Sequence, residues 1–174
     1  MTMTIAFAGE RGAFGELAAL EYFGYTEGNA GKLIALPEFG DVFRGVAQGR
    51  FRYGVVPIEN SLAGSIHENY DLLLESNLHI VGEVLLRVRH FLIANKGASR
   101  RRLRCVFSHP IVFSQCKRYL RRFPQLVLMP VSNTAAAVKK IQNENLRDAA
   151  AIASKQAAMD FDMQVLASNV ENTK

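Results

Sequence analysis

Three stretches of this sequence carry polar and glycine residues of the kind that bind small anions. They are residues 9–12 (Gly-Glu-Arg-Gly), 108–110 (Ser-His-Pro) and 132–134 (Ser-Asn-Thr). Each lies between an expected strand and an expected helix, where free backbone N–H groups and the helix dipole favour carboxylates or phosphates. Such residues also cap helices generally, so one stretch alone indicates only a helix start. The three together predict a small anionic ligand.

Other kinds of catalytic site are not indicated. Cys105, His109 and Cys116 do not have the spacing of a zinc site, so we expect no bound metal. Ser108 and His109 are backbone neighbours, which rarely point at each other, and there is no Gly-x-Ser-x-Gly motif. The glycine stretch has neither the Walker A order nor the Gly-x-Gly-x-x-Gly order. His90 falls in an apolar strand and is expected to be a buried, hydrogen-bonded histidine.

The composition is ordinary for a soluble globular protein. Hydrophobic residues make up 49% and charged residues 21% of the 174, which suits one domain or two small subdomains sharing a cleft. No apolar run approaches the roughly 20 residues that span a bilayer, so we expect no membrane partner. Residues 1–8 lack the pattern of a signal peptide and predict a first strand. Two cysteines imply no disulfide framework, and a cytoplasmic location is expected.

The formal net charge is +5, and much of the excess falls in residues 100–104 and 117–122. A nucleic-acid-binding surface is one interpretation of these two basic clusters. No recognised binding motif accompanies them. We therefore favour a solvated surface around a pocket that receives an anion, and we expect no nucleic-acid partner.

Strands alternate with helices along most of the chain. The apolar pattern predicts strands at residues 5–8, 33–36, 53–58, 105–107, 127–129 and 149–153. It predicts helices at residues 14–24, 37–49, 110–122, 134–143 and 154–161, a helix around residues 70–74, and a long extended stretch at residues 78–93. Repeated strand–helix units predict an α/β fold with mostly parallel sheets and helices on both faces.

Six segments occur in an order that is more specific than any of them alone. They are residues 9–19, 54–73, 81–92, 108–116, 134–137 and 149–153. In this order they resemble the prephenate dehydratase family over nearly the whole chain. The resemblance implies a two-lobed fold like that of type II periplasmic binding proteins. It places residues 1–78 in the first lobe and residues 79–166 in the second, with the active site between the lobes.

The resemblance also implies an enzyme, a carbon–oxygen lyase of phenylalanine biosynthesis. Such an enzyme converts prephenate to phenylpyruvate, with loss of carbon dioxide and of the ring hydroxyl as water, and needs no metal or organic cofactor. Because aromatisation drives the reaction, the protein mainly has to hold two carboxylates and help hydroxide leave. A homodimer or homotetramer is the assembly that the resemblance suggests.

Positions matching the family's motifs supply the expected site residues. Asn60 and Gln115 are expected to contact the substrate, and Glu59 either acts in catalysis, orients Asn60 or another site residue, or stabilises the loop. The remaining predicted substrate contacts lie in loops and at helix starts: Gly12, Ala13, Ser61, Ser108, Asn133 and Thr134. The resemblance suggests a mainly structural His109, while Arg11 either binds a carboxylate or points into solvent.

The largest departure from the family pattern is at the end of the sequence. The family closes with Asn-x-Thr-Arg-Phe, whose threonine is the leading candidate for the catalytic hydroxyl. This chain ends Asn-Thr-Lys at residues 172–174, and the spacing from residues 165–166 places the motif further on, so Thr173 is not assigned that role. We therefore expect a partial chain without the threonine motif or an ACT regulatory domain, in which residues 167–174 begin an incomplete segment returning to the first lobe.

Two alternatives remain open. Arogenate dehydratases share the same motifs, so arogenate is a second candidate substrate. The same two-lobed fold also binds small anions without reacting them, and a chain without the threonine could be such a non-catalytic binding module.

Overall fold

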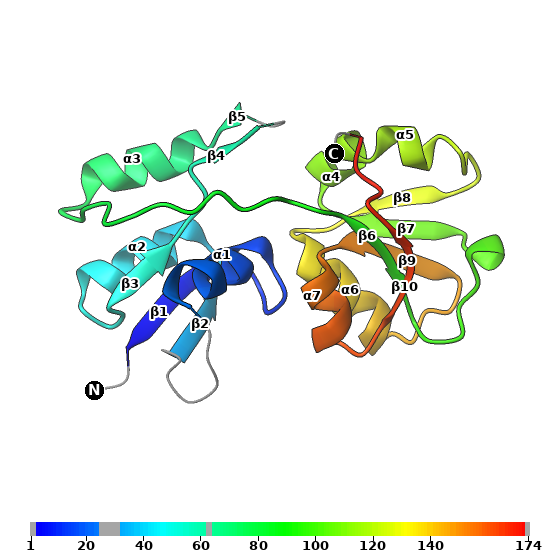
Figure 1. Ribbon diagram of the computed structural model, residues 1–174, viewed down its shortest axis with the longest axis horizontal. Helices are drawn as coiled ribbons and strands as arrows, with labels where there is room; N and C mark the ends of the chain where they lie inside the picture. Colours follow the sequence, from blue (N-terminus) through cyan, green and yellow to red (C-terminus); the bar gives the residue numbers. More distant parts are fainter. Residues whose placement is uncertain (1–2, 25–31, 62–63, 173–174) are drawn as a thin grey trace. The chain divides into compact units, whose positions relative to one another are not determined.

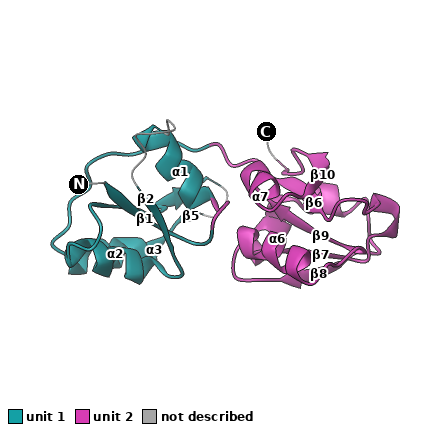
Figure 2. Cartoon of the chain, turned by 90° about the horizontal axis from the view of Figure 1, so that it is seen from below, with its two compact units in different colours: residues 1–10, 14–86 teal, residues 11–13, 87–174 magenta. Residues whose placement is uncertain are grey.

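The computed structural model describes residues 3–24, 32–61 and 64–172, and Figure 1 shows its elements. The chain forms two compact units, which Figure 2 colours separately. Unit 1 comprises Met1–Glu10 and Phe14–Leu86, and unit 2 comprises Arg11–Ala13 and Arg87–Lys174. The division falls after Leu86 rather than after residue 78. Residues 167–172, which were expected to begin a return to the first lobe, belong to unit 2.

Unit 1 is built on a three-stranded parallel sheet with the strand order β2-β1-β3. Its first elements are β1 (Thr4–Ala8), α1 (Phe14–Phe23), β2 (Lys32–Leu36), α2 (Phe39–Ala47) and β3 (Tyr53–Val55). Ile5 and Phe7, on one face of the central strand, are 1% exposed, and Ala6, on the other face, is fully buried, as expected of a strand covered on both faces. The third strand is shorter than expected and ends at Val55, just before Pro57, which has no N–H to donate to a neighbouring strand.

The remaining elements of unit 1 are β4 (Glu59–Asn60), β5 (Gly64–Ser65) and α3 (His67–Glu75). The long extended stretch expected at residues 78–93 forms a strand only at its end, in β6 (Phe91–Ala94). Most of its earlier residues are exposed and pair with no described strand, so no ladder of backbone hydrogen bonds forms. The Tyr22 hydroxyl donates to the Val81 carbonyl at 3.3 Å and anchors this segment on α1.

Unit 2 contains a five-stranded sheet in the order β10-β6-β9-β7-β8. After β6, its elements are a short 3-10 helix (Arg100–Arg102), β7 (Cys105–Ser108), α4 (Pro110–Gln115), α5 (Lys117–Leu120), β8 (Val127–Pro130), α6 (Thr134–Asn143), β9 (Ala149–Ala153), α7 (Lys155–Asp160) and β10 (Gln164–Ser168). Strands β7, β8 and β9 are parallel, whereas β6 runs antiparallel to β9 and β10. The predicted α/β class with mostly parallel sheets is confirmed.

Helices cover both faces of the unit 2 sheet, as Figure 1 shows. Along β9, Ala150 and Ile152 pack with α4 and α5. The alternate residues Ala149, Ala151 and Ala153 pack with α6 and α7. This alternation follows from the two-residue period of a strand, and it divides the core into two layers. In the part of the chain that the structure describes, no helix is long and apolar enough to cross a membrane.

Candidate active site

Glu59, Asn60 and Ser61 lie in the β4–β5 hairpin of unit 1. Glu59 and Ser61 are exposed, and Asn60 is half-buried. Neighbouring residues of a strand point to opposite faces. The side chains of Glu59 and Asn60 therefore leave the hairpin in different directions, which favours separate roles for them.

The base of this hairpin is held by Asn69, which sequence reasoning missed. Asn69 lies in α3, is fully buried, and donates from Nδ2 to the Pro57 carbonyl at 2.7 Å. The Ile66 N–H donates to the Ile58 carbonyl at 2.9 Å. The backbone before the hairpin is therefore fixed by a side chain of α3. A polar residue in an expected helix gives no sequence signal for such a role.

Residues 11–13 belong to unit 2 and lie against the start of α7. Ser154 caps α7 by accepting a hydrogen bond from the Ala157 N–H at 3.0 Å, and its hydroxyl donates to the Gly12 carbonyl at 2.6 Å. Ala13 is buried. The predicted glycine turn is thus attached to a helix start. Ser154 was not among the predicted site residues, although a serine at the start of an expected helix is a capping signal.

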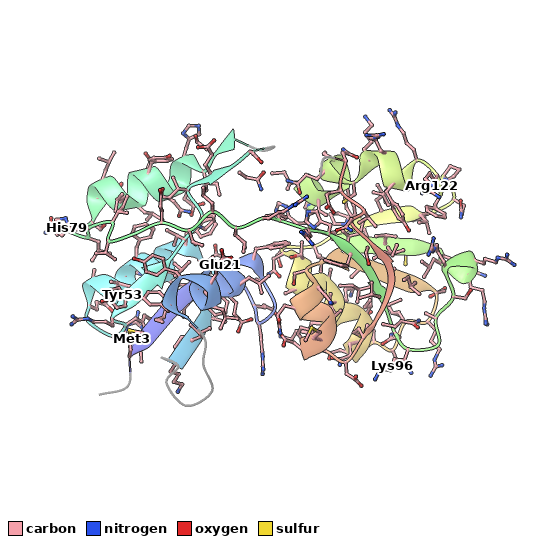
Figure 3. The ribbon with its side chains drawn as sticks, viewed as in Figure 1. Met3, Glu21, Tyr53, His79, Lys96 and Arg122 are labelled. Atoms are coloured by element: carbon pink, nitrogen blue, oxygen red, sulfur yellow. The ribbon has the colours of Figure 1, made fainter. Side chains whose placement is uncertain are left out.

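Several basic side chains are paired within the chain. Arg11 Nε lies 4.0 Å from Asp160 Oδ2, and the Arg11 side chain is 76% exposed, so it projects largely into solvent as one of its two expected placements has it. Lys96 pairs with Asp162, and the Arg122 guanidinium lies over an aromatic ring. Figure 3 shows Lys96 and Arg122 projecting from different parts of unit 2. This arrangement is typical of a solvated basic surface.

Ser108 and His109 form the junction between β7 and α4. Ser108 is fully buried, and its hydroxyl donates to the Ile152 carbonyl of β9 at 2.7 Å. His109 is the residue that caps α4, because its Nδ1 accepts from the Ile111 N–H at 3.3 Å. Ser108, which was expected to act at the helix start, is the last residue of β7. Its hydroxyl proton is already used within the sheet.

Asn133 caps α6, and Thr134 is the first residue of that helix. Asn133 Oδ1 accepts from the Ala136 N–H at 2.8 Å, and Thr134 is 8% exposed. The hydroxyl and amide groups expected at this helix start are therefore present. The Asn133 oxygen serves the helix itself, which leaves its amide nitrogen and Thr134 as the groups of interest for a ligand.

Gln115, at the end of α4, is bonded to a buried histidine. His90 Nε2 lies 2.9 Å from Gln115 Oε1, and the two residues are 1% and 7% exposed. Burial lowers the pKa of His90, and the hydrogen bond to Gln115 and the negative charge of Glu171 offset this only in part. His90 is therefore neutral near pH 7. The prediction that it is a buried, hydrogen-bonded histidine is confirmed.

The chain after β10 holds both of these residues by their backbones. The His90 N–H donates to Glu171 Oε2 at 2.9 Å, and its carbonyl accepts from the Val170 N–H at 3.0 Å. The Asn172 N–H donates to the Gln115 carbonyl at 2.6 Å. Residues 170–172 therefore fix the spacing between the start of β6 and the end of α4.

Asn172 also explains why the helix expected at residues 110–122 is divided at Cys116. Its Oδ1 accepts from the Arg118 N–H at 2.8 Å, and its Nδ2 donates to the Ser114 carbonyl at 2.8 Å. In a continuous helix these two backbone groups would bond to each other. The Asn172 side chain replaces that bond, so the prediction of one continuous helix is wrong. Thr173, the next residue, lies outside the described residues.

The chemistry available from these groups is hydrogen bonding. Within residues 3–24, 32–61 and 64–172, no three His, Cys, Asp or Glu side chains gather as metal ligands would. Cys116 follows Gln115 directly, but burial raises the pKa of its thiol to about 12, so it is no nucleophile near pH 7. Amides, hydroxyls and a neutral histidine can orient an anion and stabilise developing charge.

Comparison with known proteins identifies the family. The family model for prephenate dehydratase matches residues 5–174. The chain is 45% identical over 168 residues to arogenate dehydratase/prephenate dehydratase 2, chloroplastic, of Arabidopsis thaliana. That alignment covers 97% of this chain and 42% of the plant protein, so the chain spans less than half the length of this curated relative.

Solved structures match over 98% of the chain. The prephenate dehydratase from Staphylococcus aureus superimposes with a TM-score of 0.79 at 26% identity, covering 62% of that chain. A protein described as GqqA, a novel type of quorum quenching acylase, superimposes with a TM-score of 0.87 at 28% identity, covering 60% of that chain. The expected fold like that of periplasmic binding proteins is confirmed. With the family match over residues 5–174, this chain belongs to the prephenate dehydratase family.

Proposed function

We propose that this chain carries the active site of a lyase that converts prephenate to phenylpyruvate in phenylalanine biosynthesis. The observation that carries the proposal is the family match over residues 5–174. That range contains all six segments that resemble the family and every predicted site residue. The hydrogen-bonding character of the described polar groups supports it, because this reaction needs orientation more than a nucleophile.

The reaction leaves the protein little covalent chemistry to perform. The bond between the ring and its carboxylate breaks, and carbon dioxide leaves. The electron pair of that bond enters the ring, which becomes aromatic as the bond to the hydroxyl breaks. The departing hydroxide takes a proton and leaves as water. The protein therefore has to orient two carboxylates and supply a proton or a hydrogen bond to the leaving oxygen.

We assign the main roles to two amides and one carboxyl group. Asn60 and Gln115 donate hydrogen bonds to substrate oxygens, and Glu59 is the candidate proton donor for the leaving hydroxide. The further proposed contacts are Gly12, Ala13, Ser61, Ser108, Asn133 and Thr134. Among these, Ser108 cannot donate its hydroxyl proton to a carboxylate while it is bonded to the Ile152 carbonyl.

Arogenate is the second candidate substrate. The Arabidopsis thaliana relative at 45% identity is named for both arogenate and prephenate dehydratase activity. Arogenate differs from prephenate in carrying an amino group where prephenate has a keto group. Its product would be phenylalanine instead of phenylpyruvate, so the two activities can be measured separately on the same protein.

The test is the rate of product formation by the purified chain with prephenate and with arogenate. We expect turnover of at least one, and the larger kcat/KM identifies the substrate. Gln115→Leu and Asn60→Leu should each lower kcat/KM about tenfold or more, because each removes a hydrogen bond to a charged ligand. Gln125→Ala, at an exposed residue between α5 and β8, is the matched control and should retain wild-type rates.

Two results would contradict this function. Binding of prephenate, measured by titration calorimetry, without turnover of prephenate or arogenate would make the chain a small-anion-binding module. A chain that neither binds nor converts either compound would contradict the dehydratase proposal altogether.

We further infer a homodimer or homotetramer that acts in the cytoplasm. Assembly is supported by the family resemblance, whereas the location competes with the chloroplast named for the plant relative. Light scattering coupled to size-exclusion chromatography tests the assembly, and a monomer at micromolar concentration would contradict it. Microscopy of the tagged protein in its own cells tests the location.

A further inference from the structure

We propose that His90 is a positioning residue that holds the Gln115 amide with its oxygen toward the imidazole ring, so that the amide presents its N–H groups to the substrate. This role rests on the proposed dehydratase function, in which Gln115 binds substrate. His90 does not touch the substrate in this account. It acts through Gln115 alone.

The direction of the hydrogen bond follows from the two groups. An amide oxygen can only accept, so the ring Nε2, 2.9 Å from Gln115 Oε1, has to donate. Because burial lowers the pKa of His90, the ring is neutral and carries a single proton. That proton is on Nε2, and His90 is therefore in the Nε2–H tautomer.

The tautomer and the orientation of the Gln115 amide are coupled, because the Nε2–H form of the ring takes only an oxygen as its partner. If the amide were reversed while the ring proton stayed on Nε2, its NH₂ group would face the ring N–H, and two buried donors would lie against each other. Leaving buried donors without acceptors is costly, so the reversed orientation is disfavoured. With the oxygen toward the ring, the amide offers donors to a carboxylate. The reversed amide would present its oxygen, which repels a carboxylate.

The backbones of both residues are fixed, so the ring and the amide keep this geometry. Glu171 and Val170 bond to the two backbone groups of His90, and Asn172 bonds to the Gln115 carbonyl. The ring itself is 1% exposed. A buried partner on a fixed backbone is what orientation of a binding group requires.

The test is a double-mutant cycle on kcat/KM for prephenate, using His90→Phe and Gln115→Leu. Phenylalanine keeps an aromatic ring but has no donor. We expect each single variant to lose about tenfold to hundredfold in kcat/KM and the double variant to lose no more than Gln115→Leu alone. His90→Gln, which can place an amide N–H near Gln115, should recover part of the His90→Phe loss.

Asn95→Ala is the matched control for a merely structural effect. Asn95 also makes buried hydrogen bonds in unit 2, from Nδ2 to the Ile141 and Leu146 carbonyls, but does not contact Gln115. The fold-loss in kcat/KM that Asn95→Ala causes should multiply with the fold-loss of Gln115→Leu in the variant that carries both changes. If the wild-type chain is active and the fold-loss of His90→Phe also multiplies with that of Gln115→Leu, the positioning role is refuted while the dehydratase function stands.

A spectroscopic measurement separates the two proposals further. Ring ¹⁵N shifts of His90, assigned by their loss in His90→Phe, should show the neutral Nε2–H tautomer at pH 7. An Nδ1–H tautomer overturns the inference whatever the activity. A wild-type chain that neither binds nor converts prephenate or arogenate overturns the proposed function, and the role of His90 fails with it.

Discussion

Gly12 and Ala157 approach each other so closely that a side chain does not fit at position 12. A Cβ built on Gly12 would lie 2.7 Å from the Ala157 Cα, and Gly12 has a φ of +83°. Glycine adopts this left-handed conformation without strain, whereas alanine does not. The turn after β1 is therefore shaped by the first residues of α7, whatever ligand it also approaches.

We expect Gly12→Ala to lower the free energy of unfolding by about 3 kcal/mol, from about 1–2 kcal/mol for left-handed alanine and about 1–3 kcal/mol for overpacking. Urea unfolding followed by circular dichroism measures the change. Gly24→Ala is the control, because Gly24 has a φ of +67° but no neighbouring atom within 4 Å of its built Cβ. Equal losses in the two variants would show that Ala157 imposes no constraint.

Asn172→Ala should destabilise the junction between α4 and α5. The change removes two exposed hydrogen bonds, to the Ser114 carbonyl and from the Arg118 N–H, at a cost of about 0.5–1.5 kcal/mol each in the free energy of unfolding. Amide hydrogen exchange at Arg118 should also become faster. The exposed Gln125→Ala variant is the control, and a melting temperature equal to that of the control would contradict the role of Asn172.

Cys116 should be inert towards thiol reagents in the folded protein. It is fully buried, and burial raises the pKa of its thiol to about 12, so almost no thiolate forms at pH 8. In a Cys105→Ser variant, in which Cys116 is the remaining cysteine, we expect no reaction with a disulfide reagent until urea is added. Rapid modification without urea would show that α4 opens in the native state.

The elements that the sequence predicted well are those with a strong apolar pattern, periodic in the helix and continuous in the strand. The helix expected at residues 134–143 coincides with α6, and the strand at residues 149–153 coincides with β9. Neither the β4–β5 hairpin nor β10 was predicted. Each strand of the hairpin has two residues, and β10 pairs at the sheet edge with a bulge and has two exposed residues, so neither carries a clear pattern.

The site illustrates why local pattern is not enough. Gln115 and His90 were each singled out, but their bond joins residues 25 positions apart and follows only from the packing of β6 against α4. The break at Cys116 depends on Asn172, which lies 54 positions beyond Arg118. Local propensity gave no reason to end the helix there, and a tertiary hydrogen bond decided it.

The pKa of His90 also predicts how stability depends on pH. In the folded state it is lowered below 6.5, chiefly by burial, whereas an unfolded histidine titrates near its ordinary value of about 6.5. Below about pH 6.5, His90 of the unfolded chain binds a proton, whereas His90 of the folded chain stays neutral until the pH reaches its lowered pKa. The contribution of neutral His90 is therefore fully present above about pH 6.5, and it is lost as the pH falls from there towards the folded pKa.

We expect the free energy of unfolding of the wild-type chain, measured in urea, to fall as the pH drops below about 6.5, and part of that fall to disappear in His90→Phe. Phenylalanine cannot take up a proton in the unfolded state, so the variant should be less stable overall but less sensitive to pH. His79→Gln, at an exposed histidine, is the control for removing an imidazole. If His90→Phe and the wild type lose stability in parallel over this range, protonation of His90 is not what destabilises the folded chain, and the pH dependence has to come from its carboxylates.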